Sequence, residues 1–244
     1  MTTSESSSSR IVISVSRQIV LILLLGALFA VFTMSIIELE GLYNAFGKEY
    51  FLEYGQSDTG SNNLVTAILL DYRLFDSLFE AGILLIAVSG VIWISKHDIE
   101  EKNARFMIDK FKTPDLFITF SRLVYPLMLA FGFYVIVNGH LSPGGGFQGG
   151  TIVATAILIL YYIDADKETN IGLIVTVEKI VYLLIIVLAS VSIFTRGTFF
   201  TNFFALDATQ DTKAIYLVLL NVLIGFKVAL GLWTIFTAFL KEGR

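Results

Sequence analysis

Six long apolar runs determine what this chain can fold into. They occupy residues 18–37, 77–95, 116–137, 149–163, 171–194 and 214–240. A helix needs about 20 apolar residues to cross the hydrocarbon core of a bilayer, since it rises about 1.5 Å per residue. Lipid offers no hydrogen-bonding partners, so each crossing segment must satisfy its backbone within a helix. The sequence therefore predicts an all-α polytopic membrane protein with about six transmembrane helices.

The composition agrees with a membrane location. Of the 244 residues, 55% are hydrophobic and 16% are charged, and the mean hydropathy is +0.76. Soluble proteins carry about 25% charged residues. A net charge of -4 argues against nucleic acid as a partner. The chain has no cysteine and two distant histidines, which excludes disulfides and cysteine catalysis and disfavours a metal cluster. We expect no cofactor and no resident metal.

The polar segments divide the chain into parts. Residues 1–17 are rich in serine and predict a disordered tail. Residues 18–96 hold two predicted transmembrane helices, and the strongly charged segment 97–115 links them to residues 116–244, which hold the other four. The run 18–37 is too long for the apolar core of a signal peptide, which favours an uncleaved first helix.

Lysine and arginine are distributed unevenly over the polar segments. If the N-terminus is cytoplasmic, ten of the 17 basic residues fall on inner segments and four on outer ones. The others, Arg122, Lys179 and Lys227, lie inside predicted helices. Because cytoplasmic loops carry an excess of basic residues, we expect a cell membrane protein with both termini in the cytoplasm.

The most unusual stretch is residues 138–150, which hold six of the 19 glycines between two apolar runs. Glycine suits positive φ angles and close backbone approach, and irregular backbone at membrane depth must be covered by protein or line a wet cavity. We expect a structural loop motif made by Pro143, Gly144, Gly145, Gly146, Phe147, Gly149 and Gly150. Phosphate binding is the alternative, but the lysine, strand and acidic residue of nucleotide motifs are missing.

Four charged residues lie inside the later runs. Lys227 is about midway along the sixth run, too far from either end for its amine to reach the headgroups with ease. Glu178 and Arg122 lie at similar depths in the fifth and third runs, which makes them candidate partners. Lys179 points elsewhere than Glu178, because adjacent helix residues do not face each other. Such charges mark ion paths, unless they form structural ion pairs near helix ends.

Another acidic group, Asp71, Asp76 and Glu80, lies near the start of the second long run. Glu80 is the deepest and the strongest candidate for ion handling, since carboxylates suit a cation that sheds part of its water. The preceding run, residues 63–72, is too short to span and predicts a buried or re-entrant helix. His140 can relay protons near neutral pH, but with no carboxylate nearby in sequence a hydrogen-bonding role in the loop is favoured.

The run GHLSPGGGFQGG at residues 139–150 resembles the signature of the MnhB/MrpB family, the B subunit of multisubunit Mrp sodium/proton antiporters. The resemblance covers about residues 116–240 and their four helices. It implies that other membrane subunits of an Mrp-type complex are partners, and that the function lies in monovalent cation and proton transport.

The preceding part resembles another subunit of the same system. The run NLVTAILLDYRLFDSLFE at residues 63–80 is similar to the C-terminal end of the large A subunit. It departs from that pattern at Leu64 and Thr66, and it has Tyr72 and Ser77 in place of Phe and Thr. The resemblance implies that Glu80 is the acidic residue of the cation path. An A-type tail joined to a B-type part resembles the arrangement in Mrp-related membrane-bound hydrogenases and their sulfur-reducing relatives.

We therefore predict an integral membrane subunit of a cation/proton-translocating assembly, with Na⁺ or H⁺ as the transported ion. The residues expected on the ion path are Glu80, Asp71, Asp76, Lys227, Glu178 and His140. The alternative is a non-transporting scaffold that seals and positions transporting neighbours. A stand-alone enzyme is disfavoured, because no nucleophile–base set or cofactor fingerprint is visible. Redox chemistry, if any, belongs to other subunits of a hydrogenase-type or sulfur-reducing complex.

Overall fold

The computed structural model describes residues 3–41, 46–101, 114–163, 170–205 and 207–242. The chain falls into two compact units, Met1–Glu49 and Tyr50–Arg244. In the described residues, five helices are long and apolar enough to cross a membrane: Gln18–Ile37, Leu74–Ser95, Asp115–Val137, Ile171–Arg196 and Gln210–Phe239. A shorter apolar helix covers Gly146–Leu160. The predicted all-α polytopic membrane fold is confirmed.

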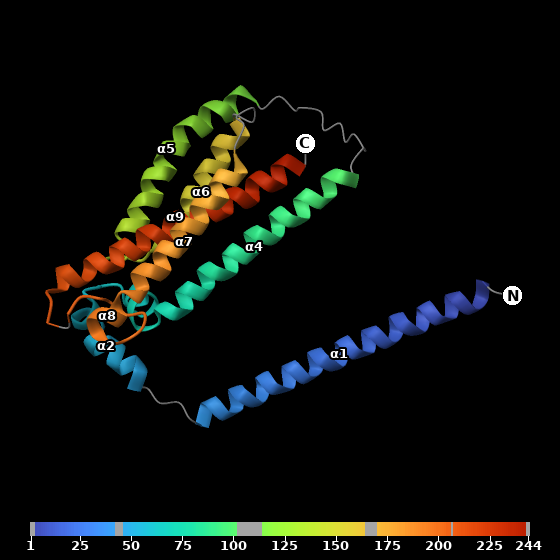
Figure 1. Cartoon of the computed structure of the whole chain (residues 1–244), viewed down its shortest axis with the longest axis horizontal. Helices are drawn as coiled ribbons and strands as arrows, with labels where there is room; N and C mark the ends of the chain where they lie inside the picture. The colour runs from blue at the N-terminus through green and yellow to red at the C-terminus, as the bar shows by residue number, and fades with distance from the viewer. Residues whose placement is uncertain (1–2, 42–45, 102–113, 164–169, 206, 243–244) are drawn as a thin grey trace. The chain divides into compact units, whose positions relative to one another are not determined.

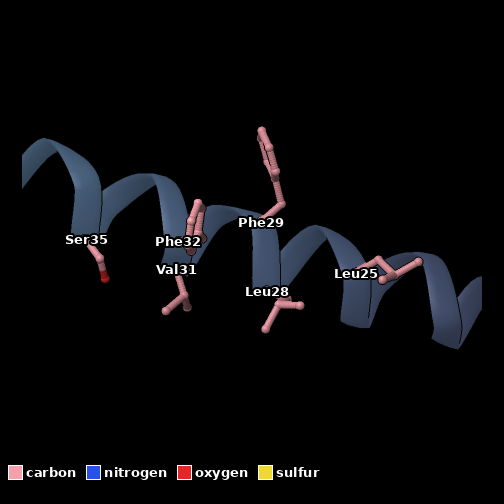
Figure 2. A pocket seen from close by; sticks show the side chains of 6 residues that line it. All are labelled: Leu25, Leu28, Phe29, Val31, Phe32 and Ser35. Carbon is pink, nitrogen blue, oxygen red and sulfur yellow. The ribbon is translucent and has the colours of Figure 1, made fainter. Parts of the chain in front are cut away.

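The first unit is dominated by helix α1 (Thr3–Gly41). Its apolar span Gln18–Ile37 has no buried residue. Side chains of this span line a groove on the surface of the helix, as Figure 2 shows for Leu25, Leu28, Phe29, Val31, Phe32 and Ser35. The helix starts within residues 1–17, whose serine content favoured disorder. Serine costs less than about 0.7 kcal/mol relative to alanine in a helix, so a strong downstream helix can extend through it.

Helix α9 (Gln210–Glu242) is the centre of the second unit. It contacts α4 (Leu74–Glu101), α5 (Asp115–Val137), α6 (Gly146–Ile163) and α7 (Ile171–Ser190), as can be followed in Figure 1. Within the chain, 56% of the α9 span is buried, against 17–22% for the spans of α4, α5 and α7. The surrounding helices therefore present broad apolar faces away from the core.

Helix α4 belongs to this same core. Leu74, Leu78 and Val88 of α4 are buried, and α4 packs against α7 and α9. The division expected at the linker 97–115 therefore separates two segments that share one hydrophobic core. Residues 102–113 of that linker lie outside the described residues.

Short helices and loops gather at one end of the second unit. They include α2 (Phe46–Thr59), α3 (Leu64–Ala67), the π-helix η1 (Ile68–Tyr72) and α8 (Ser192–Arg196). The short helix predicted at residues 63–72 is confirmed, although its second half is π-helical. Hydrogen bonds join residues 55–73, 138–146, 197–205 and 207–213 here, and we call these residues the loop end.

Candidate functional site

An ion pair lies in the interior of the second unit. Glu178 on α7 and Lys227 on α9 are both fully buried, and Nζ of Lys227 lies 3.1 Å from Oε1 of Glu178. The predicted pairing of Glu178 with Arg122 was wrong, because Arg122 is exposed on α5 while α7 packs mainly against α4 and α9. Lys179 is exposed, as expected for the neighbour of a buried helix residue. Two residues predicted for the ion path are thus in direct contact.

Tyr182 and Gly231 complete the surroundings of this pair. Nζ of Lys227 lies 6.0 Å from the centroid of the Tyr182 ring, and the Tyr182 hydroxyl donates to the carbonyl oxygen of Leu78 on α4 at 3.2 Å. A methyl group added at Gly231 would lie 3.0 Å from Oε1 of Glu178. Glycine at this position therefore makes room for the carboxylate where α4, α7 and α9 meet.

The pair keeps unused hydrogen-bonding capacity. Among the described residues, the charged atoms of Glu178 and Lys227 have no partner apart from each other. A carboxylate can accept about four hydrogen bonds and an ammonium can donate three. A buried pair is held firmly only when these remaining positions are also satisfied. The site is thus suited to taking up water and to holding a proton on either the carboxylate or the amine.

Asp76 and Glu80 lie apart from this pair, on the exposed face of α4. Glu80 is exposed within the apolar span Leu74–Ser95, beside the exposed side chains of Phe79 and Ile83. No hydrogen bond or ion pair to Glu80 is found in the part of the chain that the structure describes. Asp76 forms a surface ion pair with Arg73. Both carboxylates therefore face outward from this chain.

Asp71 is buried at the loop end, on η1. Its side chain is 6% exposed, and its Oδ1 accepts the backbone N–H of Asn202 at 2.8 Å. Burial raises the pKa of the Asp71 carboxyl above its ordinary value, while the Asn202 N–H and the charges of Arg196 and Lys213 oppose that rise. Asp71 therefore differs in kind from the exposed Asp76 and Glu80 that follow it.

Asp58, on α2, is a functional candidate that the sequence reasoning did not single out. Its Oδ2 accepts hydrogen bonds from the hydroxyls of Tyr72 at 2.7 Å and Tyr50 at 3.1 Å. Burial, followed by the hydrogen bond to Asp58, raises the pKa of Tyr72, and the separate hydrogen bond of Tyr50 to Asp58 raises the pKa of Tyr50. The signal in the sequence was an acidic residue among tyrosines in a polar segment. The electrostatic effect of Asp58 on Asp71 is evident only from the three-dimensional structure.

The glycine-rich loop is fastened to the segment at residues 61–66. Nδ2 of Asn63 donates to the carbonyl oxygens of Gly139 at 2.8 Å and Ser142 at 2.9 Å. The hydroxyls of Ser61 and Thr66 donate to loop carbonyls at 2.9 and 2.7 Å. The two motifs that resemble different subunits thus meet in one hydrogen-bonded structure.

His140 takes the hydrogen-bonding role favoured by its sequence context. Its carbonyl oxygen accepts from the Ser61 hydroxyl at 2.9 Å and from the Asn63 N–H at 3.1 Å. Its Nδ1 lies 3.2 Å from the carbonyl oxygen of Val137. These contacts hold His140 within the loop, whereas its proposed part in an ion path stays a prediction.

The remaining glycines of the motif allow helices to pack closely. Helix α6 begins at Gly146, inside the glycine-rich stretch, as the short length of its apolar run required. A Cβ on Gly150 would lie 2.6 Å from the carbonyl oxygen of Gly225 on α9, and one on Gly149 would lie 2.8 Å from that of Gly132 on α5. These two positions let α6 lie directly against both neighbours.

The loop before α6 also needs glycine. Gly144 and Gly145 have φ angles of 156° and 146°, which L side chains rarely adopt. Pro143 precedes them, and Phe147 packs against the hydrophobic core of the second unit. These residues therefore shape the loop and allow the close approach of α6 to its neighbours.

Comparison with known proteins identifies the part of the chain that holds this loop and the ion pair. Residues 116–234 match the family described as a domain related to the MnhB subunit of Na⁺/H⁺ antiporter. This region is an MnhB-type domain.

The chain is 34% identical over 112 residues to an uncharacterized protein of Methanocaldococcus jannaschii, covering 40% of this chain and 42% of that protein. It is 46% identical over 43 residues to putative antiporter subunit mnhB2 of Staphylococcus aureus, covering 18% and 30% respectively. The chain thus spans less than half the length of these relatives.

Two solved structures extend the similarity beyond the MnhB-type domain. One is the membrane-bound sulfane sulfur reductase, an archaeal respiratory membrane complex, with a TM-score of 0.65 and 27% identity over 88% of this chain and 96% of the matched one. The other is the Mrp complex from Dietzia sp., with a TM-score of 0.51 and 25% identity over 75% of this chain and 22% of the matched one. A chain of this length and layout therefore occurs in the respiratory complex.

Proposed function

We propose that this chain is an integral membrane subunit of a multisubunit complex that translocates monovalent cations or protons. The observation that carries the proposal is the fully buried Glu178–Lys227 pair inside the MnhB-type domain. Charges inside membrane spans are costly and are rarely kept without a role. The similarity to the Mrp complex and to the sulfane sulfur reductase supports other membrane subunits as the partners.

Of the two types of complex, the respiratory type is the better supported. The similarity covers 96% of the matched chain in the sulfane sulfur reductase but only 22% of the matched chain in the Mrp complex. This chain also joins an A-type tail to a B-type part, which resembles the arrangement in Mrp-related hydrogenases and their sulfur-reducing relatives. The proposal places the driving redox chemistry in other subunits and gives this chain no catalytic site of its own.

Glu80 is the carboxylate that we assign to a subunit interface. A carboxylate exposed on a membrane span costs at least about 2.5 kcal/mol if it meets only lipid. Its neighbours on the same face, Phe79 and Ile83, are 59% and 66% exposed and provide an apolar surface for a partner helix. Glu80 then meets water or a cationic side chain supplied by that partner, and it contributes to the ion path from there.

The second candidate function is a scaffold that seals and positions transporting neighbours. The observation that favours it is the internal pairing of Glu178 with Lys227, because a static ion pair inside one chain carries no ion. Buried apolar side chains of α9, among them Leu217, Leu220 and Ile224, also lie between this pair and the loop end.

The test compares assembly with transport in the same variants. Tagged chains carrying Glu178→Gln, Glu80→Gln or Lys179→Gln are purified in mild detergent with their partners, and ion movement is measured in sealed membrane vesicles. Lys179 is the matched control because it is exposed and adjacent to Glu178. The translocation role predicts loss of transport in the first two variants with the complex intact, and normal transport in the third. Loss of assembly in both glutamate variants supports the scaffold, and a chain that purifies without partners refutes complex membership.

We also propose the cell membrane as the location, with both termini in the cytoplasm and the loop end on the outer side. The support is the distribution of basic residues over the polar segments, with ten on the segments assigned to the inside and four on those assigned to the outside.

A further inference from the structure

A buried polar cluster surrounds Asp71 at the loop end. The groups that act electrostatically on Asp71 are Asp58 of α2, Arg196 of α8 and Lys213 of α9, while Asp71 acts on Tyr216 of α9. Lys213 is 5% exposed, and its Nζ donates to the carbonyl oxygen of Ser57 at 3.1 Å. The cluster therefore holds two acidic groups, Asp71 and Asp58, and two basic groups, Arg196 and Lys213.

Two atoms of this cluster lack partners. Tyr216 is fully buried, and its hydroxyl makes no hydrogen bond with any described residue. Nε of Arg196 is also buried without a partner among those residues. A buried polar group without a partner costs about 1–3 kcal/mol, and such groups in native structures are commonly satisfied by an ordered water.

The loop after α8 covers this cluster. Asn202 is 1% exposed. Its side-chain Nδ2 donates to the carbonyl oxygen of Lys213 at 3.0 Å, and its backbone N–H donates to Oδ1 of Asp71. The Phe203 ring meets the Tyr216 ring edge-on, with centroids 5.2 Å apart. Phe200 holds a positive φ of 56°, a conformation that a bulky residue adopts only when its surroundings impose it. The loop is thus firmly docked over Asp71.

We infer that Asp71, Tyr216 and Arg196 enclose a bound water, and that the Asp71 carboxylate takes up one proton there to become the neutral acid. The hydroxyl of Tyr216 and Nε of Arg196 supply the two donors that the water needs, and Asp71 supplies its acceptor. The inference adds a proton-binding site to the proposed function and rests on that function for any part in transport.

The ligand chemistry favours a proton over a metal cation. Two cationic side chains already act on Asp71, so a sodium ion would bring a third positive charge to a cluster that holds two carboxylates. Hard cations also need about six oxygen ligands, and no group of three or more His, Cys, Asp or Glu side chains able to hold a metal occurs among the described residues. A proton needs only the carboxylate, and burial already favours the neutral acid.

The site is separate from the Glu178–Lys227 pair. Tyr216 and Lys227 are eleven positions apart on α9, or about 16 Å at about 1.5 Å per residue. The α9 side chains between them include the buried apolar residues Leu217, Leu220 and Ile224 and the buried Asn221, whose Oδ1 accepts the N–H of Gly146 at 2.8 Å. Proton exchange at Asp71 is therefore expected from the loop end and independent of the ion pair.

Infrared difference spectroscopy on the purified full chain in lipid nanodiscs tests the inference without any partner or transport assay. Aspartate labelled with carbon-13 separates aspartic acid carbonyl bands from those of glutamic acid. We expect a labelled protonated carbonyl band that disappears as the pH rises, with a midpoint above the ordinary aspartate value of about 3.9. Asp71→Asn removes the band, whereas the matched variant Asp211→Asn, at an exposed position on α9, retains it.

Two further variants test the cluster itself. Tyr216→Phe and Arg196→Gln each raise the midpoint of the Asp71 band, because each removes a group that stabilises the ionised carboxylate directly or through the water. Exchange into water labelled with oxygen-18 shifts a bound-water band in the wild type and not in Tyr216→Phe. The inference is overturned if the labelled wild type shows no such carboxyl band, or if Tyr216→Phe leaves the midpoint unchanged. The labelled wild type decides the first point even if Asp71→Asn does not fold.

Discussion

At the residue scale, the charged groups of this chain are satisfied in three different ways. Glu178 is paired with Lys227 in the core, Asp71 is held by a backbone N–H and by charges at a distance, and Glu80 faces outward. Only in the first of these does a fully buried charge depend on a single oppositely charged partner. The Glu178–Lys227 pair is therefore the place where one substitution should have the largest effect on stability.

Lys227→Met should destabilise the chain by about 3–5 kcal/mol, because it leaves the Glu178 carboxylate buried without its counter-charge. Lys179→Met is the matched control, since Lys179 is exposed on the same helix as Glu178 and should change stability by less than about 0.5 kcal/mol. Unfolding in detergent, followed by tryptophan fluorescence, measures both.

The double variant Glu178→Leu/Lys227→Met separates loss of the pair from loss of packing. Replacing both charges by apolar groups removes the uncompensated charge, so most of the stability lost in Lys227→Met should return. If Lys227→Met alone unfolds like the wild type, the two side chains do not form the pair that the structure contains.

At the element scale, the sequence predicted helices better than it predicted their contacts. Length and hydropathy sufficed for the spans, and the short run at residues 149–163 correctly required α6 to begin among the glycines. Depth in the membrane did not identify the partner of Glu178, because partners are chosen by which helix faces meet. Arg122 lies at a similar depth but on an exposed face of α5.

The acidic segment shows a second limit of sequence reasoning. Asp71, Asp76 and Glu80 look like one cluster along the chain, yet the structure buries the first and exposes the other two. Asp71 lies on the π-helix Ile68–Tyr72, whereas Asp76 and Glu80 lie on α4, which starts at Leu74. A run of apolar residues such as ILL carries no signal that distinguishes a π turn from an α turn.

Gly150→Ala should weaken the packing of α6 against α9. The added methyl group would lie 2.6 Å from the carbonyl oxygen of Gly225, so one helix backbone must move. Gly90→Ala on α4 is the matched control, because no atom lies within 4 Å of a Cβ placed there. We expect a clear fall in the thermal unfolding temperature of the first variant. An equal response of the two variants would mean that α6 and α9 do not pack at Gly150.

At the scale of the whole molecule, the connections between the helices of the second unit can be grouped by the end of the unit at which they lie. The loops between α5 and α6 and between α8 and α9 join the segment before α4 at the loop end through hydrogen bonds. Helices α4, α5 and α9 therefore each run between the loop end and the opposite end. Which of these ends faces the cytoplasm decides from which side of the membrane protons would reach the site inferred at Asp71.

The absence of cysteine from the sequence allows this orientation to be measured directly. Thr198→Cys places a single thiol at an exposed position of the loop end, and Asp115→Cys places one at the exposed start of α5, at the opposite end. A membrane-impermeant maleimide added to intact cells should label Thr198→Cys only, since the basic residues favour the loop end outside. Both variants should react after the membrane is permeabilised, which confirms that each thiol is accessible. Labelling of Asp115→Cys alone in intact cells would invert the orientation, and it would place the Asp71 site on the cytoplasmic side.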